Sequence, residues 1–150
     1  MMAILKLLHV LSAVIWVGGM FFAYGVLRPA AVDELPPPER LRLWRNVFRR
    51  FFVWVWGAVV VILGSGLGML SFYAEGAPLY VHIMLGGGLL MVLIYAYVYF
   101  VLYRALSQHV QTENWKAAGG VLGQIRRWVG INLSLGLLIV SLAAAGAYLL

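Results

Sequence analysis

Four long runs of apolar residues divide the chain, and the polar residues gather between them. The runs lie near residues 2–27, 51–73, 79–104 and 127–149. Each contains about 20 residues or more, which is the length that an α-helix needs to cross about 30 Å of hydrocarbon. A chain of 150 residues cannot bury four such runs inside a soluble core. The pattern therefore predicts an all-α integral membrane protein, a four-helix up-down bundle that forms one domain over residues 1–150.

Basic residues are concentrated in two of the three connections between these runs. The connection between the second and third runs, near residues 74–78, has no lysine or arginine. By the positive-inside rule, the two basic connections face the cytoplasm, and both termini face the outer, periplasmic side of a bacterial inner membrane. Lys6 is then the only lysine or arginine on the outer side. The basic residues of the two connections are Arg28, Arg40, Arg42, Arg45, Arg49 and Arg50, and then Arg104, Lys116, Arg126 and Arg127.

The first connection divides into a stiff turn and a helical pattern. Residues 33–38 end in three prolines and cannot be helical throughout. Residues 39–50 alternate apolar side chains and arginines in a way that predicts a short amphipathic helix lying in the headgroup region before the second span. Solvated, lipid-facing arginines are the usual explanation of such a pattern. The alternative is an arginine cluster that binds an anionic ligand.

The composition narrows the function further. Hydrophobic residues make up 64% of the chain and charged residues 11%, far from the composition of a soluble domain. Because the chain has no cysteine, we exclude disulfides, zinc-thiolate sites, iron–sulfur clusters and a cysteine nucleophile. The net charge of +6 lies in short connections, where it sets the topology, and we expect no nucleic-acid partner. The many glycines allow close helix packing and are compatible with a homodimer.

Two histidines lie inside apolar spans, His9 in the first and His82 in the third. An ionisable side chain in a membrane segment is costly and marks a functional site by default. On a helix, His9 shares one face with Lys6, Ser12 and Trp16, because the steps between them are three or four residues. This polar face is expected to point into the bundle.

The two histidines are compatible with one cofactor held between them. Both spans enter from the outer side, and His9 and His82 lie about 10 Å and about 5 Å below the starts of their helices. In an up-down bundle the first and third helices are diagonal, with axes roughly 13 Å apart. That separation suits a haem b with two imidazole ligands to its iron. Gly86, one turn from His82, would leave room for the macrocycle, and Lys6 could pair with a propionate.

Two other interpretations of the histidines stay open. The rings could simply form hydrogen bonds across helices, to Ser12 or to a backbone carbonyl. They could also hold a small metal ion, although closed zinc and copper sites use three or four protein ligands and the spans supply only two histidines. In either case His9 and His82 would be the residues involved.

Two segments of the first span resemble a known membrane superfamily. They are residues 5–19, Leu-Lys-Leu-Leu-His-Val-Leu-Ser-Ala-Val-Ile-Trp-Val-Gly-Gly, and the later Leu27-Arg28-Pro29. The run is similar to the first helix of CopD-like copper-resistance proteins and of HemJ-type protoporphyrinogen oxidases. His82 stands where HemJ-type proteins have the histidine of a His-x-Lys motif. Arg127, Trp128 and Asn132 are similar to the residues that open the last helix of that family.

The resemblance implies a haem b at His9 and His82, and oxidation of protoporphyrinogen IX with electrons passed to the respiratory chain. One departure puts the oxidase activity in doubt, because Met84 replaces the lysine of the His-x-Lys motif. The CopD-like relatives imply copper import across the inner membrane. The chain has no cysteine, methionine-rich tract or histidine string that would form a copper path.

The sequence thus favours a haem b membrane protein that transfers electrons through bis-histidine iron, with a quinone or a tetrapyrrole as partner. Six-coordinate iron has no open position for oxygen chemistry, which favours electron transfer. The alternatives are a HemJ-like membrane oxidoreductase, a CopD-like copper transport or resistance protein, and a structural subunit of a larger complex.

Overall fold

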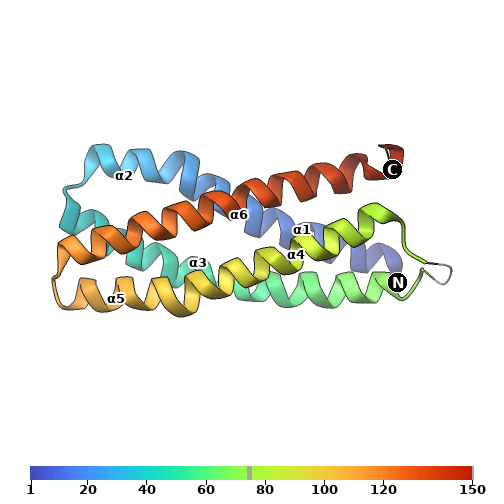
Figure 1. Ribbon diagram of the computed structural model, residues 1–150, viewed down its shortest axis with the longest axis horizontal. Helices are drawn as coiled ribbons and strands as arrows, with labels where there is room; N and C mark the ends of the chain where they lie inside the picture. The colour runs from blue at the N-terminus through green and yellow to red at the C-terminus, as the bar shows by residue number, and fades with distance from the viewer. Residues whose placement is uncertain (74–75, 150) are drawn as a thin grey trace.

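The computed structural model describes residues 1–73 and 76–149, and these form four long helical rods (Figure 1). Ala74 and Glu75, in the connection predicted between the second and third spans, lie outside the described residues. Two of the rods contain a short π-helical segment, labelled η. The elements are α1 (Met2–Phe22), η1 (Ala23–Leu27), α2 (Arg28–Glu34), α3 (Pro37–Leu70), α4 (Leu79–Tyr97), η2 (Val98–Tyr103), α5 (Arg104–Gln111) and α6 (Trp115–Leu149).

The four-helix membrane fold is confirmed. All four rods are long and apolar enough to cross a bilayer, and they alternate in direction so that both termini lie at the same end of the bundle (Figure 1). That the termini face the outer side stays a prediction, because it rests on the distribution of basic residues alone.

The helices are longer than the predicted spans, and the extra length lies at the basic end. The apolar rods contain between 32 and 34 residues each. At 1.5 Å per residue a rod of this length measures about 50 Å, against about 30 Å of hydrocarbon. The bundle therefore continues past the hydrocarbon for roughly 20 Å. Span four, predicted near residues 127–149, begins as a helix at Trp115.

The segment 39–50 is helical, but it is not a separate helix in the headgroup region as the sequence suggested. It forms the first turns of α3 and runs without a break into the second span. The reason is that its apolar side chains Leu41, Trp44 and Phe48 are buried in the bundle and continue in register into Phe52. An apolar stripe is more stable when it packs against neighbouring helices than when it contacts lipid headgroups.

Prolines account for the break between the first two rods and for the π-helical segment before it. Leu35 is extended because it precedes Pro36, and Pro37 starts α3, where a missing N–H costs nothing. A regular α-helical turn before Pro29 is unfavourable, because the proline ring would clash with the carbonyl group four residues earlier. In η1 the N–H of Arg28 instead reaches the carbonyl of Ala23, five residues back.

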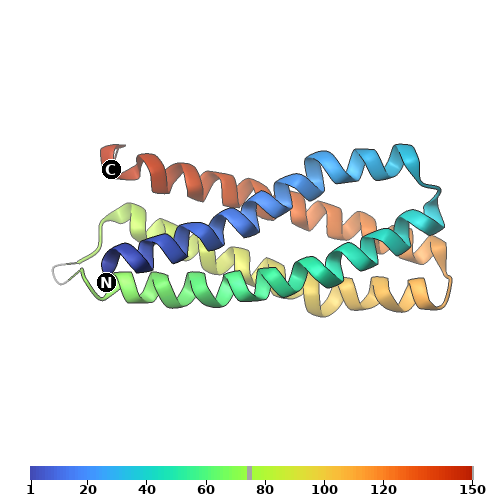
Figure 2. The same cartoon turned by 180° about the vertical axis from the view of Figure 1, so that it is seen from behind.

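The packed core lies in the half of the bundle that ends at the basic connections. Among the described residues, the first large buried side chains are Trp16 on α1 and Met91 on α4, and the last on α3 is Val59. Toward the termini, α1 stays against α3 and α4 stays against α6, while α6 diverges from α1 (Figures 1 and 2). Among the described residues, few side chains in the half toward the termini are buried.

Aromatic side chains of α3 and α4 form the centre of the core. The rings of Phe52 and Trp56 each meet the ring of Tyr95 edge-on, at centroid distances of 5.5 and 5.1 Å. The Tyr95 hydroxyl donates a hydrogen bond of 3.1 Å to the carbonyl of Phe52. This contact joins two neighbouring helices in the part of the bundle where water is excluded.

Tyr95→Phe is expected to lower the stability of the bundle by about 0.5–1.5 kcal/mol, because it removes one interhelical hydrogen bond and leaves the ring in place. The measurement is the unfolding midpoint in detergent with increasing denaturant. Tyr99→Phe is the matched control, since Tyr99 packs on Phe52 and Trp56 and no hydrogen bond of its hydroxyl is found in the described part of the chain. Equal midpoints for the two variants would refute the contribution of this bond.

Asn132 on α6 lies between α1, α3 and α4 and is 3% exposed. Its Oδ1 has no hydrogen-bond partner among the described residues. The side chain borders a small cavity of about 30 Å³ that Trp16, Tyr95 and Phe52 also line. The residue is therefore buried, and within the described part of the chain its side-chain oxygen forms no hydrogen bond to a neighbouring helix.

Candidate functional site

His9 lies on the inner face of α1 and is held by α3. Its Nδ1 is 3.1 Å from the carbonyl oxygen of Ile62 and 3.0 Å from Oγ of Ser65. A carbonyl oxygen only accepts hydrogen bonds, so Nδ1 carries the hydrogen. The Ser65 hydroxyl donates to the carbonyl of Val61 at 2.5 Å and accepts from the histidine. The ring is thus fixed as the tautomer whose Nε2 has a free lone pair, the arrangement found in metal-ligating histidines.

Small residues of α3 make room for this imidazole. A Cβ at Gly66 would lie 3.3 Å from Cε1 of His9, and one at Gly68 would lie 3.2 Å from a methyl group of Leu5. Ser65, between these glycines and Gly64, is itself buried. The sequence did not identify Ser65 as the partner of His9. The signal that could have found it is a hydroxyl within the glycine-rich run at 64–68, on the helix that follows the histidine helix.

The remaining residues of the predicted polar face lie where the helical spacing places them. Ser12 and Trp16 are buried, and the ring of Trp16 meets Tyr95 of α4 edge-on at 6.0 Å. Lys6 is exposed, one turn from His9 toward the N-terminus. The face therefore changes from solvent-accessible at Lys6 to closed at Trp16, with the half-buried imidazole between them.

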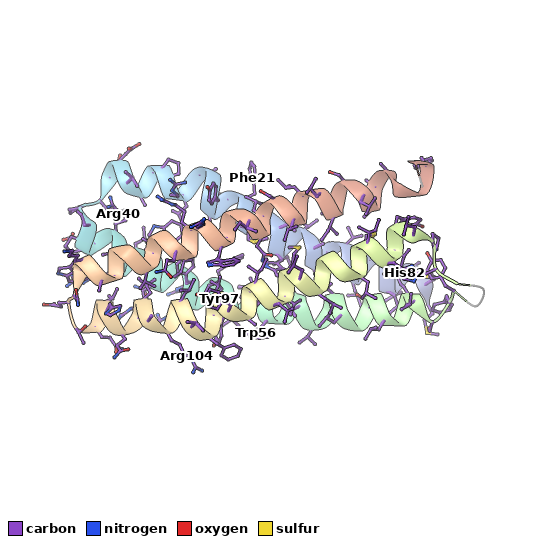
Figure 3. The ribbon with its side chains drawn as sticks, in the orientation of Figure 1. Phe21, Arg40, Trp56, His82, Tyr97 and Arg104 are labelled. Carbon is purple, nitrogen blue, oxygen red and sulfur yellow. The ribbon has the colours of Figure 1, made fainter. Side chains whose placement is uncertain are left out.

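His82 lies in the first turn of α4, close to the connection with α3 (Figure 3). Its side chain is exposed, and its Nδ1 is 3.2 Å from the carbonyl oxygen of Pro78. By the same argument, Nδ1 carries the hydrogen and Nε2 keeps a free lone pair. Gly86, one turn further, is also exposed, and a Cβ there would meet no atom within 4 Å. This side of α4 is therefore open.

The structure brings His9 together with α3, and it forms no hydrogen bond between His9 and His82 within the described residues. The two histidines nevertheless lie at one end of the bundle and at similar depth. Ser65, the partner of His9, is five residues from the end of α3, and His82 is three residues from the start of α4. At 1.5 Å per residue these positions are about 8 Å and about 5 Å from the connection.

Two imidazoles, those of His9 and His82, lie at this end of the bundle. Among the described residues, no three histidine, aspartate or glutamate side chains gather into a group that could hold a metal ion. Met84, which replaces the expected lysine, is half-buried on α4. A cofactor that brings most of its own ligands, and needs only axial nitrogens from the protein, matches this donor set better than a bare ion does.

Comparison with known families gives one match. The family model described as "Copper resistance protein D", CopD, matches residues 45–146, which span most of α3 and all of α4 and α5, and reach into the last turns of α6. The matched region includes Ser65 and His82 and begins after His9. No curated protein and no solved structure matches the chain. Because the family model covers more than half of the sequence, this four-helix membrane protein belongs to the CopD family.

Proposed function

We propose that the protein binds a b-type haem between its two helix pairs through His9 and His82, and that it transfers electrons. The observation that carries the proposal is the hydrogen-bonding of His9. Ile62 and Ser65 of α3 take the Nδ1 hydrogen and leave Nε2 as a free donor. A carbonyl or hydroxyl partner on the second ring nitrogen orients a ligating histidine and makes it a better donor.

The sparse burial in the half of the bundle toward the termini supports the fit of a flat macrocycle. Few of the described side chains in this half are buried, and Gly86 adds no side chain on α4. The surroundings are apolar, as a porphyrin ring requires. Lys6 is the exposed cation one turn from His9, and we assign it to a propionate.

In this proposal the bound haem supplies a one-electron Fe(III)/Fe(II) couple. The protein supplies the two imidazoles and an apolar setting. Ser12 and Trp16 close the space below His9 toward the core and keep water from it. The hydrogen bond from His9 to Ile62 strengthens the donor and thereby favours the oxidised metal. The partner is a quinone or a tetrapyrrole, and the site faces the outer side of a bacterial inner membrane.

Copper is the second candidate, because the CopD family is named for copper resistance. The same free Nε2 atoms of His9 and His82 would then hold a copper ion in place of the haem iron. The two candidates use identical residues, so substitution of either histidine cannot distinguish them. Only the identity of the bound metal does.

The experiment that separates them is analysis of the purified protein for iron, copper and haem. The protein is extracted in mild detergent and its metal content is measured together with a pyridine haemochrome spectrum. Haem iron near one equivalent per chain with no copper supports the first candidate. Copper without a Soret band supports the second. A colourless protein with neither metal, from cells with ample haem and copper, contradicts both.

Gly66→Val is expected to lower the haem content about tenfold or more, since the valine side chain occupies the space of the His9 ring and turns it away from Ile62. The measurement is haem per chain, with helix content recorded by circular dichroism. Gly64→Val is the control, because Gly64 is exposed and a Cβ there meets nothing within 4 Å. If both variants retained full haem, the contact of His9 with α3 would not be needed to hold the haem.

A further inference from the structure

A second site lies at the opposite, basic end of the bundle. A cavity of about 300 Å³ is lined by the first rod near α2, by the start of α3 and by α6. Three arginines line it, each from a different helical rod: Arg28, Arg40 and Arg126. Arg40 lies on the turn of α3 just below α2 in Figure 3. The rest of the lining is mainly apolar and aromatic, with Tyr24, Val32, Leu41, Trp44, Phe48 and Trp115 among its members.

Among the described residues, no ion pair neutralises the three arginines of this cavity. No acidic residue is among those that line it. The ion pair found in the described part of the chain joins Arg42 to Glu113, neither of which lines the cavity. Arg28 lies over the ring of Tyr24 at 5.2 Å, and Arg40 reaches the carbonyl of Leu35 at 3.4 Å. Three guanidinium groups around one small space repel each other unless an anion lies between them.

The position of the cavity identifies the kind of anion. Arg28 follows directly on the first apolar run, and Arg126 directly precedes the fourth. The cavity therefore opens where the helices leave the hydrocarbon. Val32, Gly119 and Arg126 are exposed at its rim, so it opens sideways between α2 and α6. Below the arginines, Phe48 and Val129 continue the lining toward the hydrocarbon. A ligand that fits has an anionic head and an apolar body.

We propose that this cavity binds the phosphate headgroup of an anionic phospholipid from the adjacent leaflet. The guanidinium groups of Arg28, Arg40 and Arg126 hold the phosphate, because a planar fork of N–H donors matches phosphate oxygens. Tyr24, Trp44 and Val129 contact the glycerol and the first acyl carbons. A cavity of this volume lies at the lower end of the range of small-molecule sites, which suits a headgroup and excludes a whole lipid.

Native mass spectrometry of the full-length protein tests the proposal, with dioleoyl-phosphatidylglycerol, dioleoyl-phosphatidylcholine and inorganic phosphate as probes. The wild type is expected to retain one phosphatidylglycerol, at least tenfold more tightly than phosphatidylcholine. The variant Arg28→Gln/Arg40→Gln/Arg126→Gln is expected to lose this preference. The matched control is Arg49→Gln/Arg50→Gln/Arg104→Gln, which removes three exposed arginines that do not line the cavity. The control is expected to bind like the wild type.

Two outcomes would overturn the proposal. Equal loss in both triple variants would mean that general positive charge attracts the lipid, without a built site. Competition by inorganic phosphate as strong as that by phosphatidylglycerol would assign the cavity to a free anion. Gly123→Phe provides an independent variant should the triple change impair folding. Gly123 lines the cavity with open space around it, so phenylalanine fills the cavity while every charge is kept. This variant is expected to lose the tightly bound lipid as well.

Discussion

Replacing His9 by alanine is expected to remove at least nine tenths of the haem, measured as Soret absorbance per chain after purification in detergent. The loss follows from the geometry, since His9 is the imidazole that α3 orients, with its Nδ1 bonded to Ile62 and Ser65. Without His9, the haem would be held by one exposed histidine, His82. His82→Ala is expected to lose haem less completely, because the hydrogen bond found for His82 in the described part of the chain is a local one, to the carbonyl of Pro78 just before α4.

His109→Ala is the control for both histidine variants. His109 lies on α5, at the end of the bundle opposite to the predicted haem. The His109→Ala variant is expected to keep the full Soret band. Its helix content and elution volume should match those of the other variants. Unchanged haem in His9→Ala, in a protein that folds normally, would exclude His9 as a ligand. Loss of haem in His109→Ala would show that the site has been placed at the wrong end.

Gly136→Leu is expected to destabilise the bundle by about 1–3 kcal/mol, because it overpacks a helix crossing. Gly136 on α6 lies between α1 and α4, and a Cβ there would be 2.9 Å from Val17 and 3.1 Å from Met91. A larger side chain forces α6 away from both neighbours in the region where the core begins. The measurement is the thermal unfolding midpoint in detergent.

Gly18→Leu is the matched control, since Gly18 is exposed on α1 and a Cβ there meets no atom within 4 Å. Its midpoint is expected to stay within the error of the wild type. If the unfolding midpoint of Gly136→Leu also stayed at the wild-type value, α6 would not cross α1 and α4 at this residue. Because Gly136 lies on the core side of His9 and His82, this outcome would also change the expected depth of the haem site.

The number of helices and their alternation could be predicted from the sequence, because both follow from the length of apolar runs. The break at Leu35 and Pro36 could be predicted for an equally local reason, the exclusion of helical geometry before proline. The inward position of Ser12 and Trp16 followed from the 3.6-residue period. Each of these features depends on neighbouring residues within one helix.

Features that depend on how two helices pack against each other could not be predicted from the sequence. The arginines of residues 39–50 suggested a helix in the headgroup region, whereas Leu41 and Trp44 are buried against other helices. The contact of His9 with Ser65 depends on the rotation of α3 about its axis, which no pattern in either helix reveals. The similarity to HemJ-type oxidases, and an exchange of electrons with a quinone, stay predictions for the same chain.

Electron paramagnetic resonance of the oxidised, purified protein at low temperature tests the pairing of His9 and His82 most directly. The spectrum distinguishes low-spin ferric iron between two imidazoles from high-spin ferric iron and from copper(II). We expect a low-spin ferric signal typical of bis-imidazole coordination, which is lost in His9→Ala. A copper(II) signal with nitrogen hyperfine structure, or a high-spin ferric signal unchanged by either histidine substitution, would contradict the pairing.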